Sequence, residues 1–388
     1  MTSSPVRLDT VERLAVHAPP TARAHLPALT AARFIAAFQV LLFHCTNWST
    51  WLPSPVRTFA STGYIAVAFF FILSGFILTY TYWSPMRAGL RLGVFYKARF
   101  ARIYPMYMAA LLLALPFYAK AVMHGHGGAA RGIRDALLTV SLLQAHVPSA
   151  ALTWNPPAWS LSTEAFFYFC FPFVLPVLLR GSMLRAWLTA VVAVIVAVAL
   201  PIAYLAINPD GIGSPDFEAS ATWLNLLRYH PLARFAEFLL GMCVARAYLD
   251  QPSLRTPRAA MLLTATSLAT LAGLLAFADH IPYVLLHNGL LAPAFAALVL
   301  GLATTTAISK PLQRRWLVTL GEASYGLYIL HIPLFMAAGA VARKITEDGD
   351  KSGWFTLAFI AFAIAISAVA YRMVEVPARR FLLKRSVR

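Results

Sequence analysis

Long apolar runs separated by short polar segments make up most of the chain. A helix of roughly 20 apolar residues crosses the hydrocarbon core of a bilayer. The runs are continuous instead of alternating, which favours helices over the strands of a barrel. We therefore predict an all-α polytopic membrane protein, a bundle of about ten transmembrane helices. The predicted spans lie near residues 29–47, 63–82, 103–122, 164–180, 187–207, 231–249, 259–278, 288–308, 322–342 and 354–374.

One further apolar stretch, residues 135–147, is too short to cross a bilayer comfortably. We expect a short interfacial or re-entrant helix there, and an eleventh span is the alternative. With this stretch outside the bilayer core and the N-terminus in the cytosol, 23 of the 32 Lys and Arg residues lie on the cytosolic side. Because basic residues favour that side, the pattern predicts ten spans with both termini in the cytosol.

Composition decides how the net charge of +17 is interpreted. The 388 residues are 60% hydrophobic and 12% charged, whereas a soluble domain carries about 25% charged residues. In a soluble protein such a charge suggests nucleic acid, but in a membrane protein it first marks topology. We expect the lipid bilayer as a partner and no nucleic acid. The expected division is a flexible cytosolic tail (1–28), a transmembrane domain (29–376) and a basic cytosolic tail (377–388).

The first predicted span contains Arg33 and His44, eleven residues apart. Eleven residues are about three helical turns, so both side chains share one face and lie roughly 16 Å apart along the axis. Polar residues at membrane depth are functional candidates by default. The alternative is an Arg that extends to the interface and an ordinary interfacial His.

The third predicted span begins with Arg99 and Arg102 on one helix face. A guanidinium group binds phosphate oxygens in a bidentate manner, so this pair is a candidate anion site. Ordinary positive-inside charge explains the pair equally well.

A polar stripe of Ser324, Tyr328 and His331 follows one face of the ninth predicted span. A lone buried His is usually a satisfied core residue, but this stripe is typical of a ligand-lined cavity. Glu164 opens the fourth span, where it either complements the helix dipole or pairs with a nearby His. In the second span, Ser74 precedes a glycine, which indicates close helix packing or the approach of a thin ligand.

Several kinds of site are not supported by the sequence. It contains no G-x-S-x-G, H-E-x-x-H, Walker A or G-x-G-x-x-G motif, and no cluster with metal-ligand spacing. Hydrolase, zinc peptidase, ATPase and dinucleotide-binding functions therefore have no support. We expect no metal and no bound cofactor.

The same polar residues occur in one order that resembles the integral-membrane acyltransferase family 3, the OafA-like O-acyltransferases. The resemblance covers about residues 28–380, and the end of the chain soon after the last span resembles the form without an appended hydrolase domain. The motifs are Arg33-x10-His44, Gly63 to Phe76 with Ser74-Gly75, Arg99-x-x-Arg102-x-x-Pro105, Trp159-Ser-Leu-Ser-Thr-Glu164, Ser324-Tyr325-x-x-Tyr328-x-x-His331 and Glu375-x-Pro377.

The resemblance implies transfer of an acyl group, often acetyl, from acyl-CoA to a hydroxyl of a sugar, glycan or glycosylated small molecule such as a macrolide. It implies a multi-pass protein of the bacterial inner membrane, with homodimerisation as a further expectation. By position, the implied catalytic residues are His44, Glu164 and His331. The implied acyl-CoA ligands are Arg33, Arg99, Arg102, Ser74 and Tyr328. One departure is Ala66, where relatives often have a second glycine.

These residues suggest a path for the donor. The CoA head would lie on the cytosolic arginines, and its pantetheine arm would pass Ser74 and Tyr328. The thioester would reach His44 and Glu164, with His44 as general base or transient acyl carrier. The rivals are a transporter or flippase of lipid-linked sugars, which internal repeats would have favoured, and a non-catalytic acyl-CoA sensor.

Overall fold

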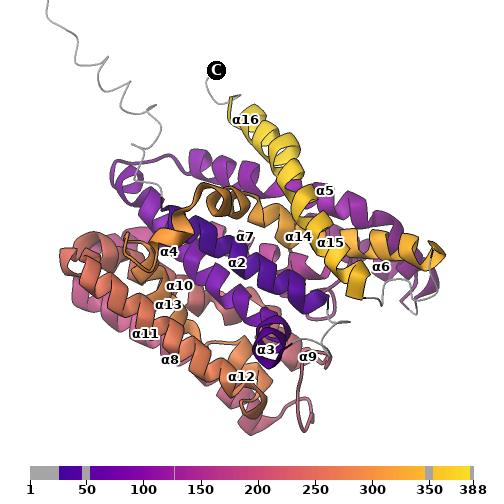
Figure 1. Ribbon diagram of the computed structural model, residues 1–388, viewed down its shortest axis with the longest axis horizontal. Helices are drawn as coiled ribbons and strands as arrows, with labels where there is room; N and C mark the ends of the chain where they lie inside the picture. The colour runs from indigo at the N-terminus through magenta and orange to yellow at the C-terminus, as the bar shows by residue number, and fades with distance from the viewer. Residues whose placement is uncertain (1–25, 46–52, 126, 346–352, 385–388) are drawn as a thin grey trace, which may run out of the picture.

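The computed structural model describes residues 26–45, 53–125, 127–345 and 353–384, and its regular elements are all helices. Figure 1 shows the helices packed as one bundle, with α2 crossing its centre. The helices are α2 (Pro27–His44), α3 (Ser54–Ser61), α4 (Ala66–Arg87), α5 (Leu92–His124), α6 (Gly128–Val140), α7 (Trp159–Arg180), α8 (Met183–Ile207), α9 (Thr222–Tyr229), α10 (Pro231–Asp250), α11 (Pro257–Ala276), α12 (Tyr283–His287), α13 (Ala292–Leu302), α14 (Arg315–Ile345), α15 (Gly353–Ala370) and α16 (Val376–Lys384).

Nine helical segments of the described chain are long and apolar enough to cross a membrane. The predicted span that is missing from these nine is 231–249, which the structure shows as α10. This helix contains Arg234, Glu237 and Arg246, so its composition is too charged for a typical span. Most of α10 is buried against α4 and α8, and its charges therefore face protein instead of lipid. The predicted all-α membrane fold is confirmed.

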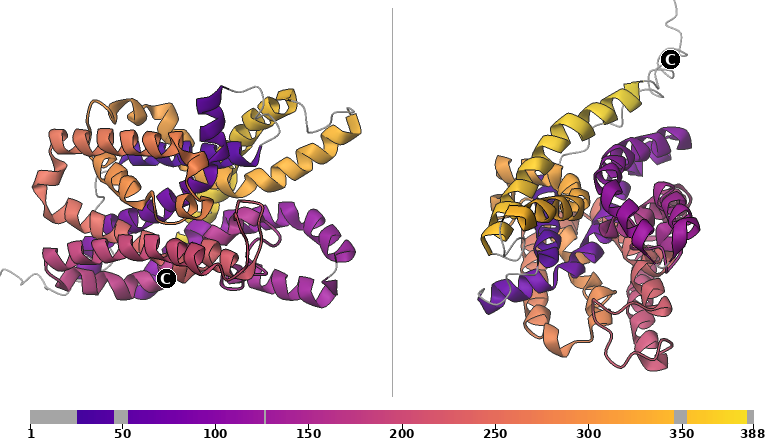
Figure 2. Two further views of the ribbon diagram at one scale, coloured as in Figure 1. Left: turned by 90° about the horizontal axis from the view of Figure 1, so that it is seen from below. Right: turned by 90° about the vertical axis from the view of Figure 1, so that its right-hand side faces the viewer.

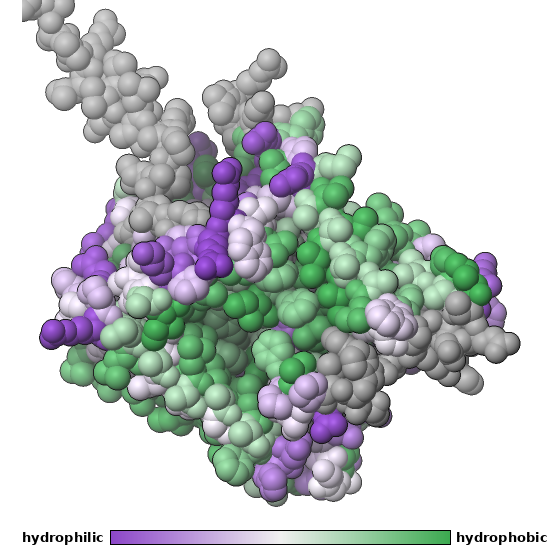
Figure 3. Space-filling model, viewed as in Figure 1, coloured by the Kyte–Doolittle hydropathy of each residue, from purple (hydrophilic) through white to green (hydrophobic). Residues whose placement is uncertain are grey.

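The outer surface of the bundle is apolar. Large hydrophobic side chains are exposed along α8, among them Leu188, Val192 and Ile195. Figure 3 shows one face largely covered by apolar side chains, with hydrophilic ones gathered toward its upper and lower edges. Such a band is the surface that a bilayer requires.

The helix predicted within residues 135–147 lies earlier in the chain. It is α6, which has 13 residues and ends at Val140, and a short 3-10 turn follows at Gln144–His146. Its length is below that of a membrane-crossing helix. Asp135 is buried and pairs with Arg131 and Arg134 on the same helix.

A close helix contact in the centre joins α4 to α10 through two glycines. A Cβ on Gly75 would lie 2.1 Å from the carbonyl oxygen of Phe238, and one on Gly241 would lie 2.0 Å from that of Ile72. No side chain fits at either position, so the two backbones touch. Gly75 therefore serves helix packing, and Ser74 is left to face the other way, into a cavity.

The C-terminal part of the described chain continues as helix. A π-helical segment, Tyr371–Glu375, joins α15 to α16, and α16 packs on α5. Figure 2 shows α16 extending away from the bundle. Residues 377–384 of the predicted basic tail are thus helical, and α2 already begins at Pro27. The rest of the predicted N-terminal tail, residues 1–25, lies outside the described residues.

Candidate functional site

A cavity of about 860 Å³ lies between α2, α4, α5, α7 and α14. We call it the arginine cavity. Every predicted motif except Glu375-x-Pro377 contributes a polar residue to its lining, and Tyr168 adds one from outside the motifs. The polar lining residues are Arg33, Ser74, Arg99, Arg102, Ser160, Glu164, Tyr168, Ser324, Tyr325 and Tyr328.

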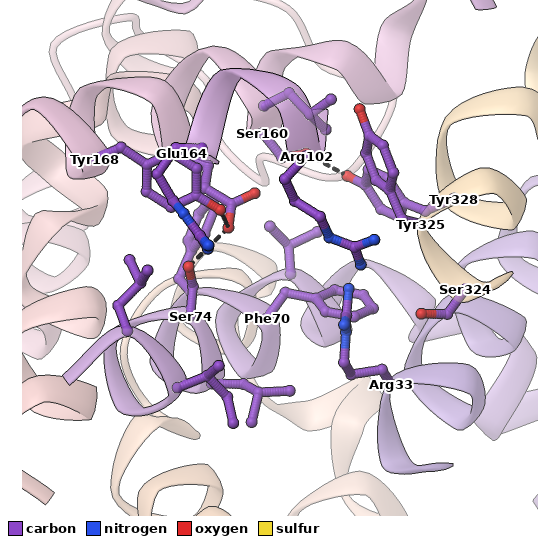
Figure 4. A pocket seen from close by; sticks show the side chains of 17 residues that line it. Arg33, Phe70, Ser74, Arg102, Ser160, Glu164, Tyr168, Ser324, Tyr325 and Tyr328 are labelled. Carbon is purple, nitrogen blue, oxygen red and sulfur yellow. Dashed lines mark hydrogen bonds between the residues drawn. The ribbon is translucent and has the colours of Figure 1, made fainter. Parts of the chain in front are cut away.

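The three arginines predicted to bind the donor all reach this cavity. In Figure 4 the guanidinium groups of Arg33 and Arg102 point toward one another across it. Arg99 donates to the Tyr82 hydroxyl at 3.2 Å and lies over the rings of Tyr82 and Tyr168. Cations that face one another in a cavity repel, so the arrangement favours a bound anion.

Arg33 and Arg102 differ in their protein partners. Among the described residues, none hydrogen bonds to the guanidinium group of Arg33. Arg102 forms an ion pair with Glu375, a buried carboxylate at the end of the π-helical segment. A single-turn π-helix is often found at a functional site, and here it positions Glu375 against α5. Sequence reasoning quoted Glu375 only as part of a motif and gave it no role.

Glu164 lies at the side of the arginine cavity, on the second turn of α7. Its Oε1 accepts hydrogen bonds from Ser74 Oγ and from the Tyr168 hydroxyl, both at 2.7 Å. The predicted pair of Glu164 with a histidine is therefore wrong, because its carboxylate is engaged by α4 and by its own helix. Tyr168 was missed, although its i+4 spacing from Glu164 on one helix could have revealed it.

The three residues of the polar stripe on α14 have different hydrogen-bond partners. Tyr328 and Ser160 share a hydrogen bond of 2.7 Å, which ties α14 to the start of α7. Ser324 donates to the Gly321 carbonyl at 2.7 Å, within its own helix. His331, one turn beyond Tyr328, is directed away from the arginine cavity and toward the end of α2.

His44 and His331 form a pair that the sequence did not predict. The distance from His331 Nε2 to His44 Nδ1 is 3.2 Å. His331 Nδ1 lies 2.7 Å from the Tyr328 carbonyl and His44 Nδ1 lies 2.9 Å from the Val40 carbonyl. A carbonyl only accepts, so both Nδ1 atoms carry hydrogen when the rings are neutral. His331 Nε2 is then an acceptor, and His44 Nε2 keeps a free lone pair.

His44 opens onto a second cavity of about 510 Å³. We call it the aromatic pocket and define it by His44, Tyr64, Trp159, Phe217, Tyr229 and His287. Val67 and Tyr328 line both cavities, so the two adjoin across a thin wall. Arg33 and His44, on one helix, thus reach adjoining cavities, as side chains on one face would.

The structure also describes charged groups buried beside the aromatic pocket. Arg234 and Glu237 pair at 2.9 Å on α10, and Arg234 donates to the His287 carbonyl at 2.8 Å. His287 Nδ1 lies 2.8 Å from the Asn288 side-chain oxygen. These residues were not singled out from the sequence, because no local spacing connects α10 to α12. No group of His, Cys, Asp and Glu suited to a metal occurs in the described residues.

Comparison with known proteins identifies the family. The family model described as "Acyltransferase domain" matches residues 26–372. The acyltransferase MdmB of Streptomyces mycarofaciens is 26% identical over 374 residues, 93% of each chain. The peptidoglycan O-acetyltransferase OatA of Listeria monocytogenes is 24% identical over 92% of this chain, which spans only 56% of that relative. Nodulation protein 10 of Rhizobium leguminosarum is 26% identical over 90% of this chain.

No solved structure is significantly similar to the chain. The family match covers most of the helical bundle and all the residues described above except Glu375. The chain therefore belongs to the integral-membrane acyltransferase family 3, and it is a multi-pass membrane acyltransferase that transfers groups other than aminoacyl groups.

Proposed function

We propose that the protein transfers an acyl group, acetyl in the first instance, from acyl-CoA to a hydroxyl of a sugar or glycoside. The arginine cavity is the donor site of this proposal. Acyl-CoA has a phosphate-rich head, and guanidinium groups are the side chains best suited to phosphate. Arg33, Arg99 and Arg102 would hold the phosphates.

The donor's thin arm would pass along the wall that the two cavities share. Ser74 and Tyr328 lie on this route, and Glu164 holds Ser74 through their 2.7 Å hydrogen bond. The thioester would then face His44. This role of Glu164, in the donor site, replaces the predicted contact with the catalytic base.

The observation that carries the proposal is the His44–His331 pair, in which His44 lines the pocket that adjoins the arginine cavity. His44 Nε2 would remove the proton from the acceptor hydroxyl as its oxygen attacks the thioester carbonyl. The new C–O bond forms, the C–S bond breaks, and CoA leaves as a thiolate that takes up the proton. His331 Nε2 and the Val40 carbonyl would accept hydrogen bonds from the Nδ1–H of the transient His44 imidazolium.

The orientation in the bilayer is part of the same proposal. We place the protein in a bacterial inner membrane with both termini in the cytosol, since that choice puts most basic residues on the cytosolic side. Acyl-CoA would then reach the arginines from the cytosol, and the acceptor would reach His44 from the opposite side.

A single-turnover assay tests the chemistry. The purified protein is mixed with radiolabelled acetyl-CoA, first without and then with a glycoside acceptor. We expect label on the glycoside and none on the protein, because direct transfer leaves His44 unmodified. Label retained on His44 would show the covalent route. Release of neither labelled glycoside nor free CoA by the intact protein would overturn the proposal, and glycoside movement across vesicles without acetyl-CoA consumption would favour a transporter.

A further inference from the structure

The aromatic pocket has a composition unlike that of the arginine cavity. Rings form most of its wall: Tyr64 and Trp159 are each stacked on His287, with ring centroids 5.9 and 6.3 Å away, and Tyr229 meets it edge-on. Among the residues that the structure describes, no Arg, Lys, Asp or Glu lines the pocket. An uncharged occupant with an apolar face fits these walls.

The polar tips of these rings have no hydrogen-bond partner in the described part of the chain. Within the described parts of the chain, nothing hydrogen bonds to the hydroxyls of Tyr64 and Tyr229 or to the indole N–H of Trp159. The Nδ1 atom of His287 pairs with the side-chain oxygen of Asn288. Its Nε2 atom also has no hydrogen-bond partner among the described residues. None of the four belongs to the sealed polar atoms that lack a partner, so water or a ligand in the pocket can reach each of them. Four such groups around one pocket suit a ligand that carries several hydroxyls.

Phe217 covers the pocket above His44. It belongs to the segment 208–221 between α8 and α9, and its ring lies 4.4 Å from that of Phe43 and 6.3 Å from that of His44. Buried Arg228 holds this segment by donating to the carbonyls of Phe217 and Ala219. Phe217 itself is 43% exposed. A half-exposed phenyl ring fixed over a pocket offers a flat apolar surface to a ligand below it.

We propose that the aromatic pocket binds a neutral pyranose ring of the acceptor, with the hydroxyl to be acylated at His44. The C–H face of the ring packs on the aromatic walls, and its other hydroxyls pair with Tyr64, Tyr229 and His287. This proposal rests on the proposed function only in taking His44 as the base. Acyl-CoA does not fit here, because the pocket offers no cation to its phosphates.

A labelling experiment tests binding without requiring catalysis. In a Cys170→Ser background, since Cys45 and Cys243 are buried, Phe217→Cys is reacted with a maleimide. The probes are neutral methyl hexopyranosides of the gluco, galacto, manno and N-acetylglucosamine series, with glycerol at equal concentration. We expect at least one pyranoside to slow the labelling several-fold, and glycerol not to.

The matched control is Glu218→Cys, the exposed neighbour on the same segment, which lies outside the pocket. Its labelling should not change. The proposal is overturned if no pyranoside protects Phe217→Cys, if glycerol protects equally, or if both positions are protected alike.

Kinetics locate the hydroxyl contacts. Tyr64→Phe and Tyr229→Phe each remove one hydroxyl, and we expect each to raise the KM for the protecting pyranoside by about 3- to 10-fold, the loss typical of one hydrogen bond. The KM for acetyl-CoA should stay the same. Tyr283→Phe is the control, because Tyr283 packs on Tyr64 behind the pocket and does not line it. Equal effects of all three variants, or an effect on acetyl-CoA alone, would contradict the pyranose site.

The two proposals fail differently. Protection by a pyranoside without any acetyl transfer leaves the pyranose site standing and overturns the proposed acyl transfer. Transfer to a pyranoside that neither protects Phe217→Cys nor responds to Tyr64→Phe leaves the acyl transfer standing and overturns the pyranose site.

Discussion

The two cavities differ in charge although they share a wall. The arginine cavity has three cations and a carboxylate around about 860 Å³, whereas the aromatic pocket has rings, neutral hydroxyls and two histidines around about 510 Å³. Arg33 and His44 of α2 reach one each. A single helix therefore presents a guanidinium group to one side of Tyr328 and an imidazole to the other.

The contrast suggests how a transferase keeps its two substrates apart. An anionic donor finds no opposite charge in the aromatic pocket, whereas three cations attract it to the arginine cavity. Only the reactive end of the donor needs to pass the shared wall. If the assignment is right, variants of the two cavities should separate into distinct kinetic classes.

The largest expected effect is that of His44→Ala. The variant lacks the imidazole whose Nε2 would accept the proton of the acceptor hydroxyl. The turnover number should therefore fall by about 10²- to 10⁴-fold. The KM for acetyl-CoA should stay near that of the parent, since the arginines remain. Steady-state assays of the purified protein measure both constants, and a near-normal turnover number would exclude His44 as the base.

Glu375→Gln should act on stability. It leaves Arg102 without its buried partner, and breaking such a pair destabilises the fold by about 3 kcal/mol. The melting temperature should fall, and free CoA should restore it more than in the parent, because a phosphate would take the place of the carboxylate. Glu218→Gln, at an exposed position, serves as the control. If free CoA raised the melting temperatures of Glu375→Gln and of the parent by the same amount, Arg102 would not be a phosphate ligand.

Arg33→Gln and Arg102→Gln should raise the KM for acetyl-CoA by about 10- to 100-fold, the loss expected for a hydrogen bond to a charged group. S-acetylpantetheine, which lacks the phosphates, should be used equally well by the variants and the parent. Arg258→Gln, on the exposed first turn of α11, is the matched control. A parallel loss with S-acetylpantetheine would mean that these arginines act on the fold and not on phosphate.

A change of ionic strength should have the smallest effect on the KM for acetyl-CoA. Raising the salt from about 0.05 M to 0.5 M shortens the range of electrostatic attraction, so the KM for acetyl-CoA should rise about 3-fold. The KM for a neutral pyranoside should not change. Equal salt dependence for both substrates would remove the distinction between the cavities.

The sequence predicted most of the fold, because a bilayer demands long apolar helices that are visible as runs. It also predicted that Arg33 and His44 would share a face, since that is a property of one helix. The predicted partner of Glu164 was wrong for the opposite reason. Contacts such as His44 with His331, 287 residues apart, depend on how α2 and α14 pack. No spacing within one element contains that information.

The role of Glu375 illustrates the same limit. Its carboxylate meets Arg102 because a π-helical segment shifts the register of the chain after α15. An apolar run predicts a helix there but not a change of helical pitch. The span 231–249 was predicted, whereas its burial depends on its packing against α4, α7 and α8, which includes the contact of Gly75 and Gly241 with the facing backbones.

The anchoring of the segment 208–221 has an evolutionary consequence. Arg228 holds it through backbone carbonyls, and every amino acid supplies a carbonyl. Side chains such as Phe217 can therefore be exchanged while the segment keeps its place. On the proposed assignment, a change of acceptor then requires substitutions in this stretch alone and leaves the proposed donor residues on α2, α5 and α14 untouched.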